Sequence, residues 1–195
     1  MTTRFQVSAL PSSDLQRIRA RGTDDFGNAI VGQADSDADG VPLRCCLREA
    51  AAGERFALIA WQPADVGGPY AEVGPVFIHV DSCPGYSAVD DYPEGFRHRR
   101  QLFRAYDAEG RQVNNQIVEG RDAELAIARL FARTDVSFVH SRNVLAGCYM
   151  SPSPGRKLPP DLGGRGSRAA GTEEKDVYPS HRVHVAGVRR TAKPR

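Results

Sequence analysis

Two segments of the chain share a layout in which an apolar run ends in a histidine and a cysteine follows. The first segment carries His79 and Cys83, and the second carries His140 and Cys148. Two imidazole nitrogens and two thiolates form a ligand set that zinc accepts in tetrahedral geometry. If the two apolar runs are neighbouring strands, these four side chains are a candidate zinc site.

The spacing of these residues favours a plainer interpretation. His-x3-Cys and His-x7-Cys match no recognised zinc signature, and the chain has no Cys-x2-Cys pair. Free cysteine is among the most frequently buried residue types, so Cys45, Cys46, Cys83 and Cys148 are expected to be small buried hydrophobic side chains. We therefore expect no cofactor, and zinc binding stays an alternative.

The same histidines and cysteines allow a second alternative, which is nucleophilic catalysis. Cys83 or Cys148 would be the nucleophile, and His140 or His79 would activate it. Such a pair needs a lowered thiol pKa and an imidazole within hydrogen-bond reach of the sulfur. No local catalytic signature surrounds either cysteine, so the sequence leaves open whether the protein is an enzyme.

Three arginines offer a different chemistry, the binding of anions. Arg44, Arg104 and Arg142 each lie in or directly after a predicted strand. The planar guanidinium group of arginine can bind a carboxylate or a phosphate through two parallel hydrogen bonds. Two such groups in one cleft would form an anion site, whereas on an exposed sheet face they would only pair with nearby acids.

Taken together, these residues favour binding over catalysis. We expect His79, Arg104, His140 and Arg142 to share one face of a sheet and to bind an anionic small molecule or a protein partner. This expectation requires the two histidine-bearing strands to lie side by side in one sheet. The alternatives are a Cys/His-dependent enzyme and a structural zinc-binding domain.

The elements that must position these residues follow from hydrophobic periodicity. Alternating or continuous apolar runs predict strands at residues 5–10, 43–48, 55–61, 75–80, 102–106, 112–118 and 136–140. Gly110 supplies the turn between residues 102–106 and 112–118, which makes these two strands a hairpin. The run at 55–61 is apolar almost throughout, as is typical of a central strand covered on both faces.

Residues 121–133 carry the best helical pattern. Apolar residues recur at i, i+3, i+4, i+7 and i+8, with acids in the first turn and arginines in the last. A shorter helix is expected after Ser12, Ser13 and Asp14, which are predicted to cap it. The predicted fold class is therefore α+β, with an antiparallel or mixed sheet packed against one good helix and one or two short ones, followed by a disordered C-terminal tail.

Composition divides the chain near residue 150. Residues 151–195 hold ten Lys/Arg against four Asp/Glu, together with six Pro and six Gly, whereas residues 1–150 have a net charge of −4. A basic segment so poor in apolar side chains cannot offset its ordering entropy, so we expect one domain at 1–150 and a disordered basic tail at 151–195. A mildly acidic domain lacks the electrostatic footprint of a specific nucleic-acid-binding protein.

The lengths of the apolar runs indicate whether the protein spans a membrane or is secreted. None of them approaches the ~20 residues that a membrane-spanning helix needs, and the N-terminal residues contain no apolar core of a secretory signal. We therefore expect a cytoplasmic protein with reduced thiols and no membrane partner.

An ordered series of short motifs resembles one known family. The series comprises Arg44-Cys45-Cys46-Leu47, Gly74-Pro75-Val76-Phe77-Ile78-His79 with Cys83, Arg104-Ala105-Tyr106-Asp107, and Arg142-Asn143 with Gly147-Cys148-Tyr149. Residues 3–150 are similar to the domain of unknown function 1203 family of uncharacterised bacterial proteins. The resemblance implies no reaction, ligand or cofactor, because none is established for the family. Family members usually have a cysteine where this chain has Leu43, and they end soon after the Gly-Cys-Tyr motif. The resemblance therefore implies that residues 151–195 are an extension that the family does not share.

Overall fold

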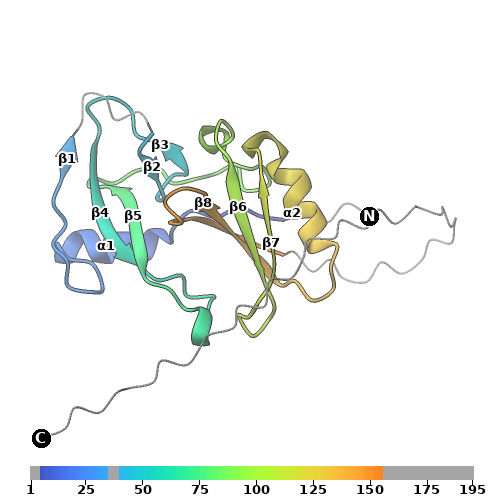
Figure 1. The fold of residues 1–195 in the computed structure, drawn as a ribbon. Helices are drawn as coiled ribbons and strands as arrows, with labels where there is room; N and C mark the ends of the chain where they lie inside the picture. Colours follow the sequence, from blue (N-terminus) through green and yellow to red (C-terminus); the bar gives the residue numbers. More distant parts are fainter. Residues whose placement is uncertain (1–4, 35–39, 156–195) are drawn as a thin grey trace, which may run out of the picture. The chain divides into compact units, whose positions relative to one another are not determined.

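Two β-sheets, each packed against one α-helix, make up the part of the protein that the computed structural model describes, residues 5–34 and 40–155 (Figure 1). One sheet is mixed and the other is antiparallel, so the predicted α+β fold class is confirmed. The expectation of a single sheet is replaced by two sheets. Within these residues no helix is long and apolar enough to cross a membrane.

The first sheet has five strands and supplies the candidate metal ligands. Its spatial order is β1 (Gln33–Ala34), β4 (Arg55–Trp61), β5 (Gly74–His79), β2 (Pro42–Leu43) and β3 (Arg48–Glu49). The β2–β5 pair is parallel and the other pairs are antiparallel. Strand β4 lies inside the sheet as predicted, but Leu58 on it is 45% exposed, so β4 is not covered on both faces.

The second sheet has four antiparallel strands. Its order is β7 (Gln112–Val118), β6 (Gln101–Tyr106), β8 (Phe138–Asn143) and β9 (Tyr149–Pro154). The predicted hairpin is β6–β7, and its turn is closed by the side chain of Asp107, which accepts backbone hydrogen bonds from Glu109 and Arg111. Gly110 has a φ of 76°, the left-handed conformation that the turn requires.

Each helix contributes an apolar face to a different core. Helix α2 (Ala123–Phe131) is the predicted good helix, and its buried residues pack in a cluster with Phe103 and Val139 of the second sheet. Helix α1 (Ser12–Arg21) buries Leu15 and Ile18 in a cluster with residues of the first sheet (Figure 1). Three short 3-10 helices complete the described elements: η1 (Gly68–Tyr70), η2 (Glu94–Phe96) and η3 (Gly120–Asp122).

Local details differ from the sequence expectation at the start of the chain. Helix α1 begins after Pro11 and has no side-chain cap hydrogen bond, so the predicted capping by Ser12, Ser13 and Asp14 is wrong. The predicted strand at 5–10 is reduced to an isolated bridge between Phe5 and Gly155. The backbone N–H groups of Gln6 and Ser8 nevertheless donate to β9, at the carbonyl oxygens of Pro154 and Pro152.

The predicted strand at 43–48 is also wrong. Residues 42–43 and 48–49 form the two-residue strands β2 and β3, and residues 44–47 form the turn that connects them. Leu47 closes this turn by donating its N–H to the carbonyl oxygen of Leu43 at 2.9 Å. Cys45 and Cys46 therefore lie in a turn and not in a strand.

The second sheet continues past residue 150. Strand β9 runs to Pro154, and Ser151 and Ser153 are buried in it. The expectation that residues 151–155 belong to the tail is therefore wrong. The remainder of the predicted tail, residues 156–195, lies outside the described residues.

Candidate metal centre

The register of the first sheet brings the turn at 44–47 beside the end of β5. In the parallel β2–β5 pair, Leu43 lies opposite Phe77, and the N–H of Arg44 donates to the carbonyl oxygen of Phe77 at 2.8 Å. Two residues further along each segment, Cys45 reaches His79, whose backbone N–H donates to Cys45 Sγ at 3.3 Å. Strand pairing thus places a thiol against the histidine that ends β5.

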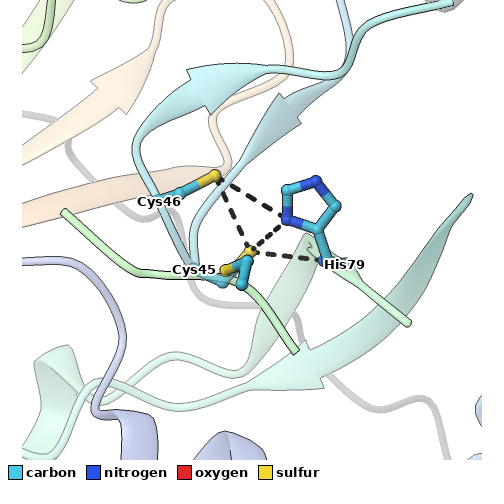
Figure 2. A group of neighbouring side chains, drawn as sticks. Cys45, Cys46 and His79 are labelled. Carbon is cyan, nitrogen blue, oxygen red and sulfur yellow. Dashed lines mark hydrogen bonds between the residues drawn. The ribbon is translucent and has the colours of Figure 1, made fainter. Parts of the chain in front are cut away.

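Four side chains of metal-ligating type converge at this point. The ligand atoms of Cys45, Cys46, His79 and Cys83 all lie within 4.8 Å of one another. Cys45 Sγ is 3.2 Å from His79 Nδ1 and 4.0 Å from Cys46 Sγ, and Cys46 Sγ is 3.8 Å from the same Nδ1. Figure 2 shows both sulfurs directed toward the His79 ring. The Cys45, Cys46 and His79 side chains are buried, and Cys83 is partly buried.

These distances match the dimensions of a tetrahedral thiolate–imidazole site. With zinc–sulfur bonds of about 2.3 Å and zinc–nitrogen bonds of about 2.0–2.1 Å, neighbouring ligand atoms lie about 3.5–3.8 Å apart. The separations of 3.2, 3.8 and 4.0 Å among Cys45 Sγ, Cys46 Sγ and His79 Nδ1 bracket that range. Small side-chain adjustments would therefore suffice to centre an ion among these three ligand atoms, and the Cys83 sulfur lies within 4.8 Å of each of them.

The turn that carries two of the ligands holds a strained residue. Leu47 has a φ of 55°, and it is the one non-glycine residue with positive φ in residues 5–34 and 40–155. A left-handed conformation at such a residue costs about 1–3 kcal/mol and persists where surrounding structure enforces it. The Leu47 side chain is buried, and the turn that contains it carries Cys45 and Cys46, whose sulfurs lie 3.2 and 3.8 Å from the same imidazole nitrogen.

An outer layer of charged side chains surrounds the imidazole of His79. Glu54 Oε1 lies 3.5 Å from His79 Nε2, and Arg48 Nη2 lies 3.3 Å from the same nitrogen. Arg48 donates to both oxygens of Glu54, at 2.6 and 2.7 Å. The hydrogen bonds from Arg48 and from the Ala51 N–H lower the pKa of Glu54 to about 2, so its carboxylate is ionised at neutral pH.

The contacts of His79 admit two tautomers, which differ in what Nδ1 can do. With the proton on Nδ1, this nitrogen donates toward sulfur and Nε2 accepts from Arg48. With the proton on Nε2, Nδ1 has a free lone pair for a metal and Nε2–H faces the Glu54 carboxylate. Metal-bound histidines usually donate their second N–H to a carboxylate, carbonyl or water, so the second tautomer has the partner that such a ligand needs.

The protonation of the thiols is uneven. The pKa of Cys46 is lowered, because its sulfur accepts a hydrogen bond from Cys45 and because Arg48 adds positive charge. The pKa of Cys45 is raised by donation of that hydrogen bond and by burial, and burial also raises the pKa of Cys83. Deprotonation is therefore easier at Cys46 than at Cys45 or Cys83, and a bound ion would have to displace the thiol protons that remain.

The predicted set of His79, Cys83, His140 and Cys148 does not converge. The structure brings His79 and Cys83 together, but β5 and β8 lie in different sheets, so the premise of neighbouring histidine-bearing strands is wrong. The two ligands that complete the cluster are Cys45 and Cys46. The sequence signal that could have identified them is the adjacent pair Cys45-Cys46, if these residues had been predicted to form a turn.

The predicted Cys/His pairs that involve His140 or Cys148 have other partners, whereas Cys83 and His79 lie together in the candidate metal centre. His140 Nε2 lies 3.0 Å from Asp65 Oδ2, and the ring is fully buried against Tyr106, Phe138 and Tyr149. Cys148 Sγ instead accepts a hydrogen bond from Arg44 Nη2 at 3.1 Å. Cys148 therefore has a guanidinium partner rather than the imidazole that the nucleophile hypothesis requires.

Of the three predicted arginines, Arg104 and Arg142 share one partner, whereas Arg44 has others. Arg104, on β6, donates to Glu72 Oε1 at 2.7 Å, and Arg142, on β8, forms an ion pair with Glu72 Oε2. Arg44 is buried and donates to the carbonyl oxygen of Tyr149 at 2.8 Å. Arg104 and Arg142 thus bind the same carboxylate, that of Glu72.

Comparison with known proteins gives one match. A family model described as Protein of unknown function (DUF1203) matches residues 40–152, which is more than half of the 195-residue chain. The matched range contains all four residues of the candidate metal centre. No curated protein and no solved structure matches the chain. The chain belongs to the DUF1203 family of proteins of unknown function.

Proposed function

We propose that this protein is a zinc-binding domain in which Cys45, Cys46, His79 and Cys83 hold one ion. The observation that carries the proposal is the convergence of four ligand atoms within 4.8 Å of one another, in a largely buried position. Three sulfurs and one nitrogen are a standard set for structural zinc. Carboxylate and carbonyl oxygens, which calcium and magnesium require, are not part of the set.

The role we propose for the ion is structural. All four positions of a tetrahedral site would be filled by protein ligands, which leaves none open for a substrate or a catalytic water. The ligands come from three segments: the turn between β2 and β3, the end of β5, and the loop that follows β5. An ion that binds the folded arrangement of these segments and not the unfolded chain stabilises the fold by its binding free energy.

Zinc is the best match among metals that accept thiolates. Thiolate ligands also bind copper(I) and iron, but a closed tetrahedral site with three sulfurs and one imidazole suits zinc, which has no geometric preference of its own. The four cysteines are free thiols in the structure, and the proposed centre needs three of them reduced. A reducing compartment such as the cytoplasm would supply that condition.

Elemental analysis of the purified full-length protein, prepared without an affinity tag that binds metal, tests the proposal. We expect about one zinc per chain in the unmodified protein. Cys46→Ser should lose most of the zinc, because serine is a poor ligand for this ion. Cys148→Ser is the matched control, since Cys148 lies outside the cluster and contacts Arg44.

A second pair of variants tests the imidazole ligand. His79→Gln should lower the zinc content, whereas His98→Gln should leave it unchanged, because His98 is exposed and pairs with Glu49. Circular dichroism of each variant separates loss of metal from loss of fold. A folded parent protein that takes up no zinc after incubation with the ion, or equal losses in Cys46→Ser and Cys148→Ser, would refute the proposal.

A further inference from the structure

A second site lies between two strands of the second sheet and the segment that leads into β5. Arg104 on β6 and Arg142 on β8 reach the carboxylate of Glu72, which belongs to the irregular segment between η1 and β5. Each arginine takes one oxygen of that carboxylate. None of these residues belongs to the proposed zinc ligands, so the argument for this site does not depend on the metal centre.

The positive charge at this site exceeds the negative charge that faces it. Arg104 and Arg142 share the single carboxylate of Glu72. Buried charge is costly unless it is paired, so a cluster with this surplus favours an additional anion.

Arg142 has an unused donor. Its side chain is 6% exposed, and its Nε is buried with no hydrogen-bond partner in the described part of the chain. One of its Nη1 hydrogens reaches the carbonyl oxygen of Gly147 at 3.2 Å. Buried guanidinium N–H groups are normally hydrogen-bonded, so the orphaned Nε indicates that Glu72 does not fully satisfy this arginine.

A cavity of about 330 Å³ opens beside the two arginines. Its size lies at the lower end of the range for small-molecule sites. The lining also includes the side chains of Trp61, Pro63, Val73, Ala146 and Tyr149. A cavity lined by two arginines and by apolar side chains suits a compact organic molecule that carries an anionic group.

We propose that this cavity binds a small organic anion whose carboxylate or phosphate group takes the place of Glu72 between Arg104 and Arg142. In the structure Glu72 acts as the internal occupant of the site, and the incoming anion must displace it. Glu72 is suited to leave, because its side chain is 43% exposed and it lies outside any strand. Although burial opposes ionisation, the pKa of Glu72 is lowered by Arg104 and Arg142, so the occupant is anionic at neutral pH.

The displacement model predicts how affinity responds when Glu72 is neutralised. If Glu72 occupies the arginines in about nine molecules of ten, the apparent affinity for a competing anion is about tenfold weaker than the intrinsic affinity. Glu72→Gln removes the competing charge and keeps the side-chain size. We therefore expect this variant to bind a suitable anion about tenfold more tightly than the unmodified protein.

The experiment is an isothermal titration calorimetry measurement on the full-length protein, with inorganic phosphate and, separately, with succinate as the titrant. Chloride keeps the ionic strength constant. Tighter binding of phosphate would identify a phosphate-bearing ligand, and tighter binding of succinate a carboxylic acid. Arg104→Gln, combined with Glu72→Gln, should abolish the gain, and Arg104 is the better choice because Arg142 is more deeply buried.

The matched control is Arg133→Gln, which removes an arginine that forms an exposed pair with Asp135. When it is combined with Glu72→Gln, it should leave the anion affinity of the Glu72→Gln variant unchanged. The proposal is overturned if a folded Glu72→Gln variant binds neither anion in a saturable way, or if Arg133→Gln weakens binding as much as Arg104→Gln does. Thermal unfolding of each variant verifies that it is folded before titration.

Discussion

Replacing Glu54 by glutamine tests whether the carboxylate beside His79 supports a metal-bound imidazole. The substitution keeps all four proposed ligands and removes the carboxylate charge that faces His79 Nε2 and pairs with Arg48. If Nδ1 binds zinc, Nε2 carries the proton and the ionised Glu54 stabilises that tautomer. The glutamine side chain could still accept a hydrogen bond, but it would lack the negative charge.

The size of the effect follows from the geometry of this contact. Loss of an outer carboxylate partner of a metal-bound histidine typically costs 10–100-fold in metal affinity, that is, about 1.4–2.8 kcal/mol. The Oε1–Nε2 distance of 3.5 Å is longer than a direct hydrogen bond, and Arg48 competes for the same carboxylate. We therefore expect the lower end of the range, about a tenfold loss of zinc affinity.

The assay is a competition titration of zinc between the protein and a chromophoric chelator at pH 7. Glu119→Gln is the matched control, because Glu119 is an exposed glutamate that pairs with Arg100 away from the cluster. An unchanged zinc affinity in Glu54→Gln, with His79→Gln strongly weakened, would show that the carboxylate does not support the ligand. A loss shared by Glu119→Gln would mean that general surface charge, and not this contact, sets the affinity.

Two further predictions concern the parts of the fold that hold the first sheet and helix α2. Asp24 is buried and accepts hydrogen bonds from the N–H groups of Phe26, Asn28 and Ala60, which hold its pKa below the usual value against the opposing effect of burial. Asp24→Asn should destabilise the protein by about 3 kcal/mol at pH 7 in chemical denaturation, whereas the exposed Asp135→Asn should cost under about 1 kcal/mol. Because the folded-state pKa of Asp24 is depressed, this contribution is present in full above the unfolded-state pKa and is lost as pH falls. The difference in free energy of unfolding between the parent protein and Asp24→Asn should therefore shrink in acid. A difference that does not change with pH would contradict this prediction. Gly120→Ala should destabilise the protein by about 1–3 kcal/mol, since its Cβ would lie 2.5 Å from the Arg99 carbonyl oxygen. The control Gly67→Ala, which has open space around its Cβ, should be close to neutral. Equal shifts of the melting temperature in the two variants would contradict the predicted clash.

Local signals in the sequence predict the elements that depend on local structure. The β6–β7 hairpin follows from strand-like runs on both sides of Gly110, and α2 follows from its i, i+3, i+4 periodicity. Both are confirmed. The division into two sheets depends on pairing between distant segments, which no local pattern encodes, so the assignment of His79 and His140 to one sheet is wrong.

The strand predicted at 43–48 explains why the metal centre is not found from the sequence. Successive side chains of a strand point to opposite faces, so Cys45 and Cys46 in a strand could not bind the same ion. In the structure they lie in a turn, and their sulfurs are 4.0 Å apart. Strands β2 and β3, with two residues each, are too short to leave a periodic pattern that would mark the turn between them.

Strand β9 is missed for a different reason. Its sequence contains Pro152 and Pro154, and proline-rich sequence is typical of irregular structure. Proline cannot donate a hydrogen bond to a sheet, but it is tolerated on edge strands, and β9 is the edge strand beside β8. The alternation of buried Ser151 and Ser153 with the two prolines is the signal that could have identified it.

The central claim is that three sulfurs and one nitrogen surround a single zinc ion. X-ray absorption spectroscopy at the zinc edge of the zinc-loaded, full-length protein measures that coordination directly. The account predicts three sulfur neighbours at about 2.3 Å and one nitrogen neighbour at about 2.0–2.1 Å. A first shell made mainly of nitrogen and oxygen, or one with fewer than three sulfurs, would contradict it.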